Sequence, residues 1–415
     1  MPKSFETQLR YAQPLLRTNG LYVGPAVFIG VKPRYRKTMT TSDLERQADA
    51  LAASRDFAGA RRLLGQVVAH DRGNFPAWMK LAAMANAMGD AQLALDAADG
   101  ALSVRALDFM ALLMRAMQLH TLGRTDEAGN AYGRALAQAP DAIPPQMEPV
   151  LSTATDRHRA WQQRQFQTLS DTVTAVTPMT KKLESFIASA LHIEPMEREG
   201  PTHYCYPGLG VTGFFDPNLF PWFGELDAAT DIIETEFNAV VGAEAAELVP
   251  YIQYPEGVPL DQWKTLNHNR SWTAIHLLQN GRRIESNARH CPQVMALLER
   301  LPQPNVAGAG PNAMFSLLAP GAHIPPHTGI SNTRLVCHLP LIVPAGCWFR
   351  VADDTRAWER GKAWAFDDTI DHEALNPSDQ LRVVFICDIW HPALDEAERS
   401  GTAAIMAAGG QLHGL

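Results

Sequence analysis

The sequence is short of cysteine, of basic charge and of long apolar runs, and each shortage excludes a class of protein. Its 415 residues include five cysteines, an odd number with no CxxC pair, which argues against a disulfide framework or a structural zinc site. Lysine and arginine number 36 against 44 acidic residues, a net charge of −8, so a broad nucleic-acid or anionic-membrane surface is not expected. A reducing, cytoplasmic compartment is the simplest expectation.

Apolar runs are too short to span a bilayer, which takes about 20 consecutive apolar residues. The nearest N-terminal candidate, LYVGPAVFIGV at residues 21–31, is interrupted by Gly and Pro and lacks the layout of a cleavage site, so we expect neither a signal peptide nor a membrane span. We predict an irregular N-terminal segment at residues 1–40. With 46% apolar and 19% charged residues, the chain is typical of a folded protein of two or three domains.

A 34-residue period runs through an Ala-, Leu- and Met-rich helical region at residues 41–142. Gly89 and Gly123 are one period apart. Further positions recur in three units, namely Ala60, Ala94 and Ala128, then Leu64, Ala98 and Tyr132, then Val67, Ala101 and Ala135. Small residues at fixed points let paired helices approach closely, and each unit covers the apolar face of its neighbour. The pattern predicts tetratricopeptide-like repeats that offer a surface to a peptide or protein partner; an ordinary Ala-rich helical bundle is the alternative.

Composition changes twice after the repeats. Residues 143–200 begin with Pro144 and Pro145 and continue as polar–apolar stretches, which predicts connecting helices. Over residues 201–398 Gly, Pro and aromatic residues rise, and short alternating runs predict a β-barrel or sandwich. Residues 399–415 are expected to form a C-terminal tail.

Two histidines and an arginine in this second domain have the order expected of a metal site in a small β-barrel. His327 lies in PPHTG, His372 follows 45 residues later in TIDHE, and Arg382 follows by ten more. Imidazole nitrogen with oxygen donors suits iron(II), and the planar guanidinium of arginine fits a carboxylate. We therefore expect a metal held by the histidines and an organic acid held by Arg382, although a single buried histidine is more often a hydrogen-bonded core residue.

The second domain resembles the aspartyl/asparaginyl β-hydroxylases, which are 2-oxoglutarate- and iron(II)-dependent oxygenases. The matching strings are YPGL, WTAIHLLQNGRR, PGAHIPPHTGISNTRLVCHL, GCWFRV, TRAWERGKAWAFDDTIDHE and VFICDIWHP, in order and over nearly half the chain. The helical repeats are similar to those of the larger members. The resemblance implies a multidomain α and β protein, with N-terminal tetratricopeptide-like helices followed by a double-stranded β-helix (jelly-roll, cupin-like) oxygenase domain.

The resemblance also implies roles for single residues. His327 and His372 fall on the two iron ligands, and Arg382 on the residue that grips the far carboxylate of 2-oxoglutarate. Gly329 stands where most such oxygenases have a third, carboxylate ligand, and the family shares this lack. Four further residues are expected to contact the cosubstrate or to line its pocket: Ser316, His338, Trp272 and Arg334. Of these, a strand serine is often only a small spacer, and Arg334 has equal claim to be a surface residue.

Acidic residues near the second histidine are expected to have a supporting role. Asp367, Asp368 and Asp371 should form a turn and orient His372 by hydrogen bonds instead of binding metal.

The substrate is less well defined than the cofactors. The resemblance implies that dioxygen and 2-oxoglutarate are used to hydroxylate a C–H bond, at the β-carbon of an Asp- or Asn-type residue in a peptide or protein recruited by the repeats. Members that modify Asp or Asn carry basic residues at two positions where this chain has Met314 and Val336. A free amino acid, a small peptide or an acyl chain therefore stays an alternative substrate. The non-enzymatic alternative is a repeat scaffold with a non-catalytic barrel.

Overall fold

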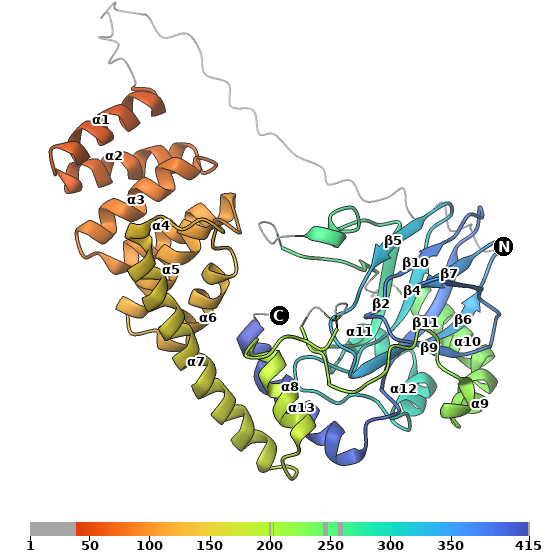
Figure 1. The fold of residues 1–415 in the computed structure, drawn as a ribbon. Coiled ribbons are helices and arrows are strands. Elements are labelled where there is room, and N and C mark those ends of the chain that lie inside the picture. Colours follow the sequence, from red (N-terminus) through yellow and green to blue (C-terminus); the bar gives the residue numbers. More distant parts are fainter. Residues whose placement is uncertain (1–38, 199–200, 202, 244–247, 256–259, 414–415) are drawn as a thin grey trace, which may run out of the picture. The chain divides into compact units, whose positions relative to one another are not determined.

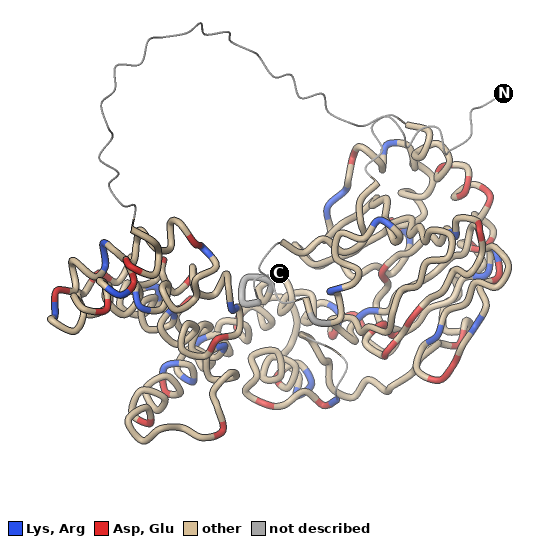
Figure 2. Tube along the Cα trace, turned by 90° about the horizontal axis from the view of Figure 1, so that it is seen from above, with Lys and Arg blue, Asp and Glu red and all other residues tan. Residues whose placement is uncertain are grey.

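The computed structural model describes residues 39–198, 201, 203–243, 248–255 and 260–413, so nearly all of the irregular segment expected at residues 1–40 lies outside the described residues. Helices occupy the first part of the described chain and two β-sheets the second (Figure 1). The predicted fold class is confirmed. Along the described trace, acidic and basic residues are interspersed (Figure 2). In the described ranges no helix has the length and apolarity that crossing a membrane demands.

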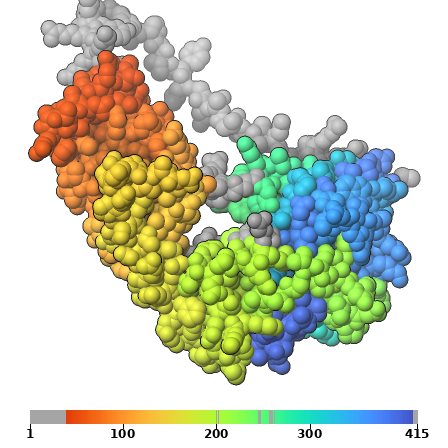
Figure 3. Space-filling view, in the orientation of Figure 1, coloured from red at the N-terminus to blue at the C-terminus, as the bar shows by residue number. Residues whose placement is uncertain are grey.

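Consecutive helices of the repeat region pack against one another, and their van der Waals surfaces meet along the red to orange part of the chain (Figure 3). They are α1 (Thr41–Ala53), α2 (Phe57–His70), α3 (Phe75–Ala87), α4 (Ala91–Val104), α5 (Phe109–Thr121) and α6 (Thr125–Leu136). The nine side chains that recur at the 34-residue period are all 2% exposed or less. These positions are therefore the packed seams of the array, as the period predicts.

The N-cap residues of the helices also recur at the 34-residue period. Asn74 and Asp108 cap α3 and α5, and Asp56 and Asp90 cap α2 and α4; each side chain accepts a hydrogen bond from the backbone N–H three residues on. Such a cap contributes about 1 kcal/mol to helix stability. In the third unit Arg124 takes the capping position without a side-chain cap and instead pairs with Glu127.

Connecting helices follow the repeats. A 3-10 turn (Pro145–Met147) leads into α7 (Glu148–Thr174), and α8 (Lys181–Ala190) comes next. Two glycines of α6 admit α7 closely: a Cβ at Gly129 would lie 2.2 Å from Cγ of Trp161, and one at Gly133 would lie 2.4 Å from Cε1 of His158. Small residues in α6 therefore set how closely α7 packs.

The expected C-terminal tail is instead a helix, α13 (Glu396–His413). Ile405 and Met406 are buried in a cluster with Leu183 of α8 and Val173 of α7. A Cβ at Gly401 would lie 2.8 Å from the Leu183 side chain, so this glycine allows α13 to pack closely against α8.

Two antiparallel sheets build the second part. The larger has the strand order β1-β2-β4-β11-β6-β9, with β3 paired to β2, and the smaller has the order β5-β10-β7-β8. The larger sheet contains β1 (Val249–Pro250), β2 (Trp272–Gln279), β3 (Arg282–Arg283), β4 (Ala313–Leu318), β6 (Arg334–Ile342), β9 (Trp364–Phe366) and β11 (Arg382–Trp390). The smaller contains β5 (His323–His327), β7 (Trp348–Val351), β8 (Asp354–Ala357) and β10 (His372–Leu375).

Alternation along the strands separates a helix-covered face from an interior face. On β4, Phe315 and Leu317 join a core with the short helices, whereas Met314 and Leu318 belong to a cluster shared with the smaller sheet. The short helices are α9 (Phe223–Ala228), α10 (Thr230–Val241), α11 (Glu285–Ala288) and α12 (Pro292–Leu298), with 3-10 turns at Pro217–Leu219 and Asp261–Trp263. Because side chains alternate between faces, Ser316 shares the interior face with Met314 and Leu318.

Left-handed backbone between paired helices offers a test of the repeat. Gly89 and Gly123 both have φ of +74°, and Arg55, one period before Gly89, has φ of +64°. A residue with a Cβ pays about 1–2 kcal/mol in this region. We expect Arg55→Gly to raise stability by about 0.5–1 kcal/mol after the larger unfolded-state entropy of glycine is subtracted.

The reciprocal change, Gly89→Ala, should destabilise by about 1 kcal/mol, and nothing lies within 4 Å of the added Cβ, so the effect is one of backbone conformation. Urea unfolding followed by helical circular dichroism measures both. If the urea midpoints of the two variants moved in the same direction, positions 55 and 89 would not be equivalent left-handed positions of the repeat.

Candidate functional site

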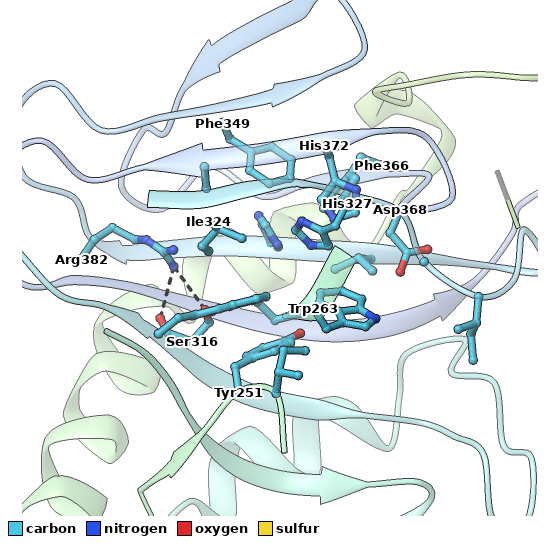
Figure 4. A pocket seen from close by; sticks show the side chains of 18 of the residues that line it. Tyr251, Trp263, Ser316, Ile324, His327, Phe349, Phe366, Asp368, His372 and Arg382 are labelled. Carbon is cyan, nitrogen blue, oxygen red and sulfur yellow. Dashed lines mark hydrogen bonds between the residues drawn. The ribbon is translucent and has the colours of Figure 1, made fainter. Parts of the chain in front are cut away.

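A cavity of about 230 Å³ lies between the two sheets, lined by side chains from both (Figure 4). All seven residues singled out in the sequence line it: His327, His372, Arg382, Ser316, His338, Trp272 and Arg334. Residues that are up to 110 positions apart in the chain, Trp272 and Arg382, thus reach one space. Their assigned roles stay predictions.

The two histidines face each other across neighbouring strands. His327 ends β5 and His372 begins β10, directly opposite in the strand register, and their ring centroids are 4.1 Å apart. Nδ1 of His327 is 2.8 Å from the Pro325 carbonyl, and Nδ1 of His372 is 2.9 Å from the Ile370 carbonyl. Because a carbonyl oxygen only accepts, each Nδ1 carries the proton, which leaves the Nε2 lone pair to bind a metal.

Both imidazoles are held in the neutral form. Burial lowers the pKa of His327. Burial and then the adjacent His327 hold the pKa of His372 well below its ordinary value. Neutral imidazole is the form that coordinates a metal, so the pair needs no proton removed before binding.

Arg382 lies at the other end of the cavity (Figure 4). It is 2% exposed, its guanidinium lies 4.8 Å above the Trp358 ring, and Nη1 donates to the carbonyl and to Oγ of Ser316, both at 3.3 Å. Its Nε is buried without a hydrogen-bond partner, and no carboxylate of the described residues forms an ion pair with it. Burial lowers the pKa of Arg382 to about 10, so the group is still a cation at neutral pH. An unpaired buried cation is costly, and an anionic ligand would offset that cost.

Further donors surround this cation. Nε1 of Trp272 donates to Oγ of Ser316 at 3.1 Å, so the serine hydroxyl already accepts two hydrogen bonds and has its own proton to donate. Nε1 of Trp358 lies 3.4 Å from Nδ1 of His338, which accepts and therefore places the His338 proton on Nε2. Burial, and then the charge of Arg382, hold the pKa of His338 well below its ordinary value. A carboxylate at this end would meet a cation and neutral donors.

Arg334 is at the cavity wall and is not a surface residue. Its Nη2 donates to Asp368 at 3.0 Å, and its Nη1 lies 3.5 Å from Asp388. Burial alone would lower the pKa of Arg334, but the two carboxylates raise it above its ordinary value. At Asp368 the effect of burial, which raises the pKa, is larger than the opposing effect of the Arg334 charge. The pKa of this carboxyl therefore rises to about 6. The guanidinium of Arg334 is therefore compensated, unlike that of Arg382.

The expected supporting role of the acidic residues needs correction. Asp367 and its neighbours do form a turn, but Asp367 bonds to Arg198 at 2.6 Å and Asp371 to Arg350 at 2.8 Å. The partner that orients His372 is the backbone carbonyl of Ile370. Among the described residues no group of three or more His, Cys, Asp or Glu side chains is placed to hold a metal, so the candidate centre rests on two histidines.

Asp368 fills the space beside Gly329. A Cβ at Gly329 would lie 2.3 Å from Oδ2 of Asp368. A side chain at position 329 is therefore incompatible with Asp368 in its present place.

Several lining residues were missed from the sequence. The Tyr251 ring stacks on Trp272 with centroids 3.8 Å apart, and the Trp263 ring lies 5.0 Å from that of His327. Gln262 ties this segment to Thr328, the residue that follows β5: its amide oxygen accepts from the N–H of Thr328 at 3.0 Å, and its NH2 donates to the Thr328 carbonyl at 2.9 Å. Trp358 lay within a string that carries the family resemblance, whereas no periodic pattern marks Tyr251, Gln262 or Trp263.

Comparison with known proteins agrees with this picture. Residues 230–392 match the family model described as aspartyl/asparaginyl beta-hydroxylase. The human aspartyl/asparaginyl beta-hydroxylase is 37% identical over 151 residues, which cover 36% of this chain and 20% of that protein. The human aspartate beta-hydroxylase domain-containing protein 2 is 38% identical over 209 residues, covering 47% and 54%.

A bacterial relative, the ornithine lipid ester-linked acyl 2-hydroxylase of Rhizobium tropici, is 33% identical over 190 residues, covering 45% of this chain and 63% of that protein. The chain thus spans between 20% and 63% of the length of these curated relatives. The resemblance found in the sequence strings is confirmed, because residues 230–392 match the model of the aspartyl/asparaginyl β-hydroxylase family.

Proposed function

We propose that this protein is a 2-oxoglutarate- and iron(II)-dependent dioxygenase that hydroxylates a C–H bond. The observation that carries the proposal is one cavity with two opposed neutral imidazoles and, beyond them, a buried guanidinium that has no carboxylate partner among the described residues. Relatives whose names state hydroxylation support the reaction class.

The lining residues suit both groups. Nε2 of His327 and of His372 would hold iron(II), which prefers imidazole with oxygen donors. Arg382, with the Ser316 hydroxyl and the Nε2–H of His338, would hold the far carboxylate of 2-oxoglutarate. The cavity of about 230 Å³ is smaller than the roughly 300–1,000 Å³ of pockets for drug-sized ligands, as expected for a small diacid.

Bound iron(II) with 2-oxoglutarate and dioxygen would supply the oxidising power for hydroxylation, with succinate and CO2 as co-products. The protein's own contribution is geometry and exclusion of water. Hydrogen bonds to backbone carbonyl oxygens fix the tautomers of both histidines. The stacked rings of Tyr251 and Trp272, together with Trp263, form an aromatic wall of the cavity. No acid–base pair is required from the side chains.

For the substrate, we propose an Asp- or Asn-type residue in a peptide or protein, modified at the β-carbon and recruited by the helical repeats. A free amino acid, a small peptide or an acyl chain is the alternative, and the Rhizobium tropici relative is named for acyl hydroxylation. A scaffold with a non-catalytic barrel is disfavoured because the complete set of histidines, Arg382 and Ser316 lines the cavity. All five cysteines are buried and unpaired, which supports a proposed cytoplasmic location.

Anaerobic addition of iron(II) and 2-oxoglutarate tests the function directly. We expect a weak visible charge-transfer band and a raised melting temperature in the native protein, because both ligands bind only the folded state. His327→Ala should abolish the band. If the native protein shows neither the band nor stabilisation, the scaffold function is favoured.

The role of Arg382 is tested by Arg382→Met, which keeps length and removes charge. We expect 2-oxoglutarate binding to weaken by about 2–5 kcal/mol, the cost of removing one partner of a buried charge pair. The apo-protein should keep or gain stability, because replacing a buried charge with an apolar side chain is often favourable. Calorimetric titration on the iron-loaded protein under anaerobic conditions measures the affinity, with the exposed Arg356→Met as control. Equal affinities in native protein and Arg382→Met would show that the acid binds in another orientation.

The lowered pKa values of the histidines predict how metal binding depends on pH. The folded-state pKa of His327 is below the ordinary 6.5 and that of His372 is well below it, so protons compete with metal only at a lower pH than they do for free imidazoles. We therefore expect cobalt(II) affinity, followed by its absorption, to change by less than about threefold between pH 7.5 and 6.0; an unperturbed pair of imidazoles would lose roughly tenfold or more over that range. A loss of tenfold or more would contradict the neutral pair.

A further inference from the structure

The strands hold the two histidines of the cavity to unequal degrees. His372 begins β10, which is paired on both sides, so that this residue lies opposite His327 of β5 and opposite Val351 of β7. His327 ends β5, which lies at the edge of the smaller sheet and pairs, among the described strands, with β10 alone. The register of that pair is irregular next to His372, and Pro325 and Pro326 have no N–H to donate to it. His327 therefore depends more than His372 on support from outside its sheet.

The 3-10 turn at Asp261–Trp263 gives that support to both the backbone and the ring. The Gln262 amide accepts from the N–H of Thr328 at 3.0 Å and donates to its carbonyl at 2.9 Å, and Thr328 directly follows His327. Thr328 has no partner in the register of the described strands, so Gln262 satisfies backbone groups that the sheet leaves open. The Trp263 ring lies beside the His327 ring, with centroids 5.0 Å apart (Figure 4).

The turn is itself anchored to the larger sheet. The N–H of Asn267 donates to the Trp263 carbonyl at 2.8 Å, and Asn267 forms an isolated β-bridge with Ile252. The N–H of Tyr251, the residue before Ile252, donates to the carbonyl of Trp272 on β2 at 3.0 Å. Hydrogen bonds thus run from the larger sheet through this segment and reach the end of β5.

We propose that Gln262 is a positioning residue of the metal site. By holding the backbone of Thr328 it fixes His327 opposite His372 before a metal arrives, so less conformational freedom is lost when the metal binds. Trp263 adds to this by packing against the His327 ring. The inference rests on the proposed function and adds to it a residue that acts on the metal only through the backbone of a ligand.

Gln262→Met tests the proposal, because it keeps the length of the side chain and removes both hydrogen bonds. The control is Lys264→Met, an exposed position two residues on. Cobalt(II) is titrated anaerobically into each full-length protein with 2-oxoglutarate present, and its visible absorption is followed. We expect cobalt to bind about 10–100-fold more weakly in Gln262→Met, the range typical of residues that orient a metal ligand, and within about twofold of the native affinity in Lys264→Met. The cobalt band should also change shape in Gln262→Met, because a displaced His327 alters the coordination geometry.

The metal-free proteins show whether the effect is specific to the metal site. The pairing of β5 with β10 and the 2.6 Å bond from the Gly329 N–H to the Asp368 carbonyl do not involve Gln262. We therefore expect the melting temperature of metal-free Gln262→Met to fall by less than about 4 °C. Native cobalt affinity with an unchanged band in Gln262→Met would overturn the proposal. If the variant loses more stability than this, hydrogen exchange of the native protein decides instead.

Hydrogen exchange of the native protein tests the same coupling from the other direction. Because coupling between two binding events is reciprocal, a bound metal should hold Gln262 on Thr328 more firmly. We expect peptides covering residues 260–268, which contain no proposed ligand, to exchange at least about threefold more slowly with cobalt(II) and 2-oxoglutarate than with 2-oxoglutarate alone. Protection of residues 323–328 without protection of 260–268 would overturn the role of Gln262 and leave the proposed function standing. If the native protein shows neither a cobalt band nor protection, the proposed function fails, and the role of Gln262 fails with it.

Discussion

The buried guanidinium of Arg382 is the constraint on which the rest of the site depends. A cation removed from water needs compensation, and here a tryptophan face, a carbonyl and a hydroxyl provide only part of it. Arg334, on a neighbouring strand of the same sheet, needs no ligand because two carboxylates neutralise it. The two arginines of this cavity therefore differ: Arg382 requires an anion to balance its charge, whereas Arg334 is already balanced and can only donate hydrogen bonds.

Side chains alternate between the two faces of a strand, and this alternation directs Ser316 and Arg382 into the same cavity. β4 and β11 pair in register with Ser316 opposite Val384 and Arg382 opposite Leu318. On β11, Val383 and Phe385 face the helix-covered core, while Val384 and Ile386 belong to the cluster between the sheets. Arg382 therefore points inward for the same reason that Val384 does. A shift of register by one residue would exchange the two faces and remove the cation from the cavity.

The sequence was most informative where chemistry or a period repeats. The 34-residue period identified nine buried side chains, because each repeat packs against its neighbours in the same way, so equivalent positions are buried in every unit. The strings around His327 and His372 located the cavity, because both histidines line it. The orientation of His372 could not be predicted, since its partner is a backbone carbonyl that any residue at position 370 would supply. Gln262 and Trp263 could not be predicted either, because each meets a residue more than 60 positions away: Gln262 bonds to Thr328, and the Trp263 ring lies against His327.

The need for a glycine at position 329 and the pairing of Arg334 have one structural cause. Asp368 occupies the space that a side chain at position 329 would need, with its Oδ2 2.3 Å from the place of a Cβ. The same Oδ2 accepts from Arg334 at 3.0 Å. Introducing a carboxylate at position 329 would therefore displace Asp368 and leave Arg334 with less compensation, in a region that already holds two acidic groups. The glycine at position 329 and the neutralised Arg334 thus belong together, because the glycine makes room for the carboxylate with which the arginine pairs.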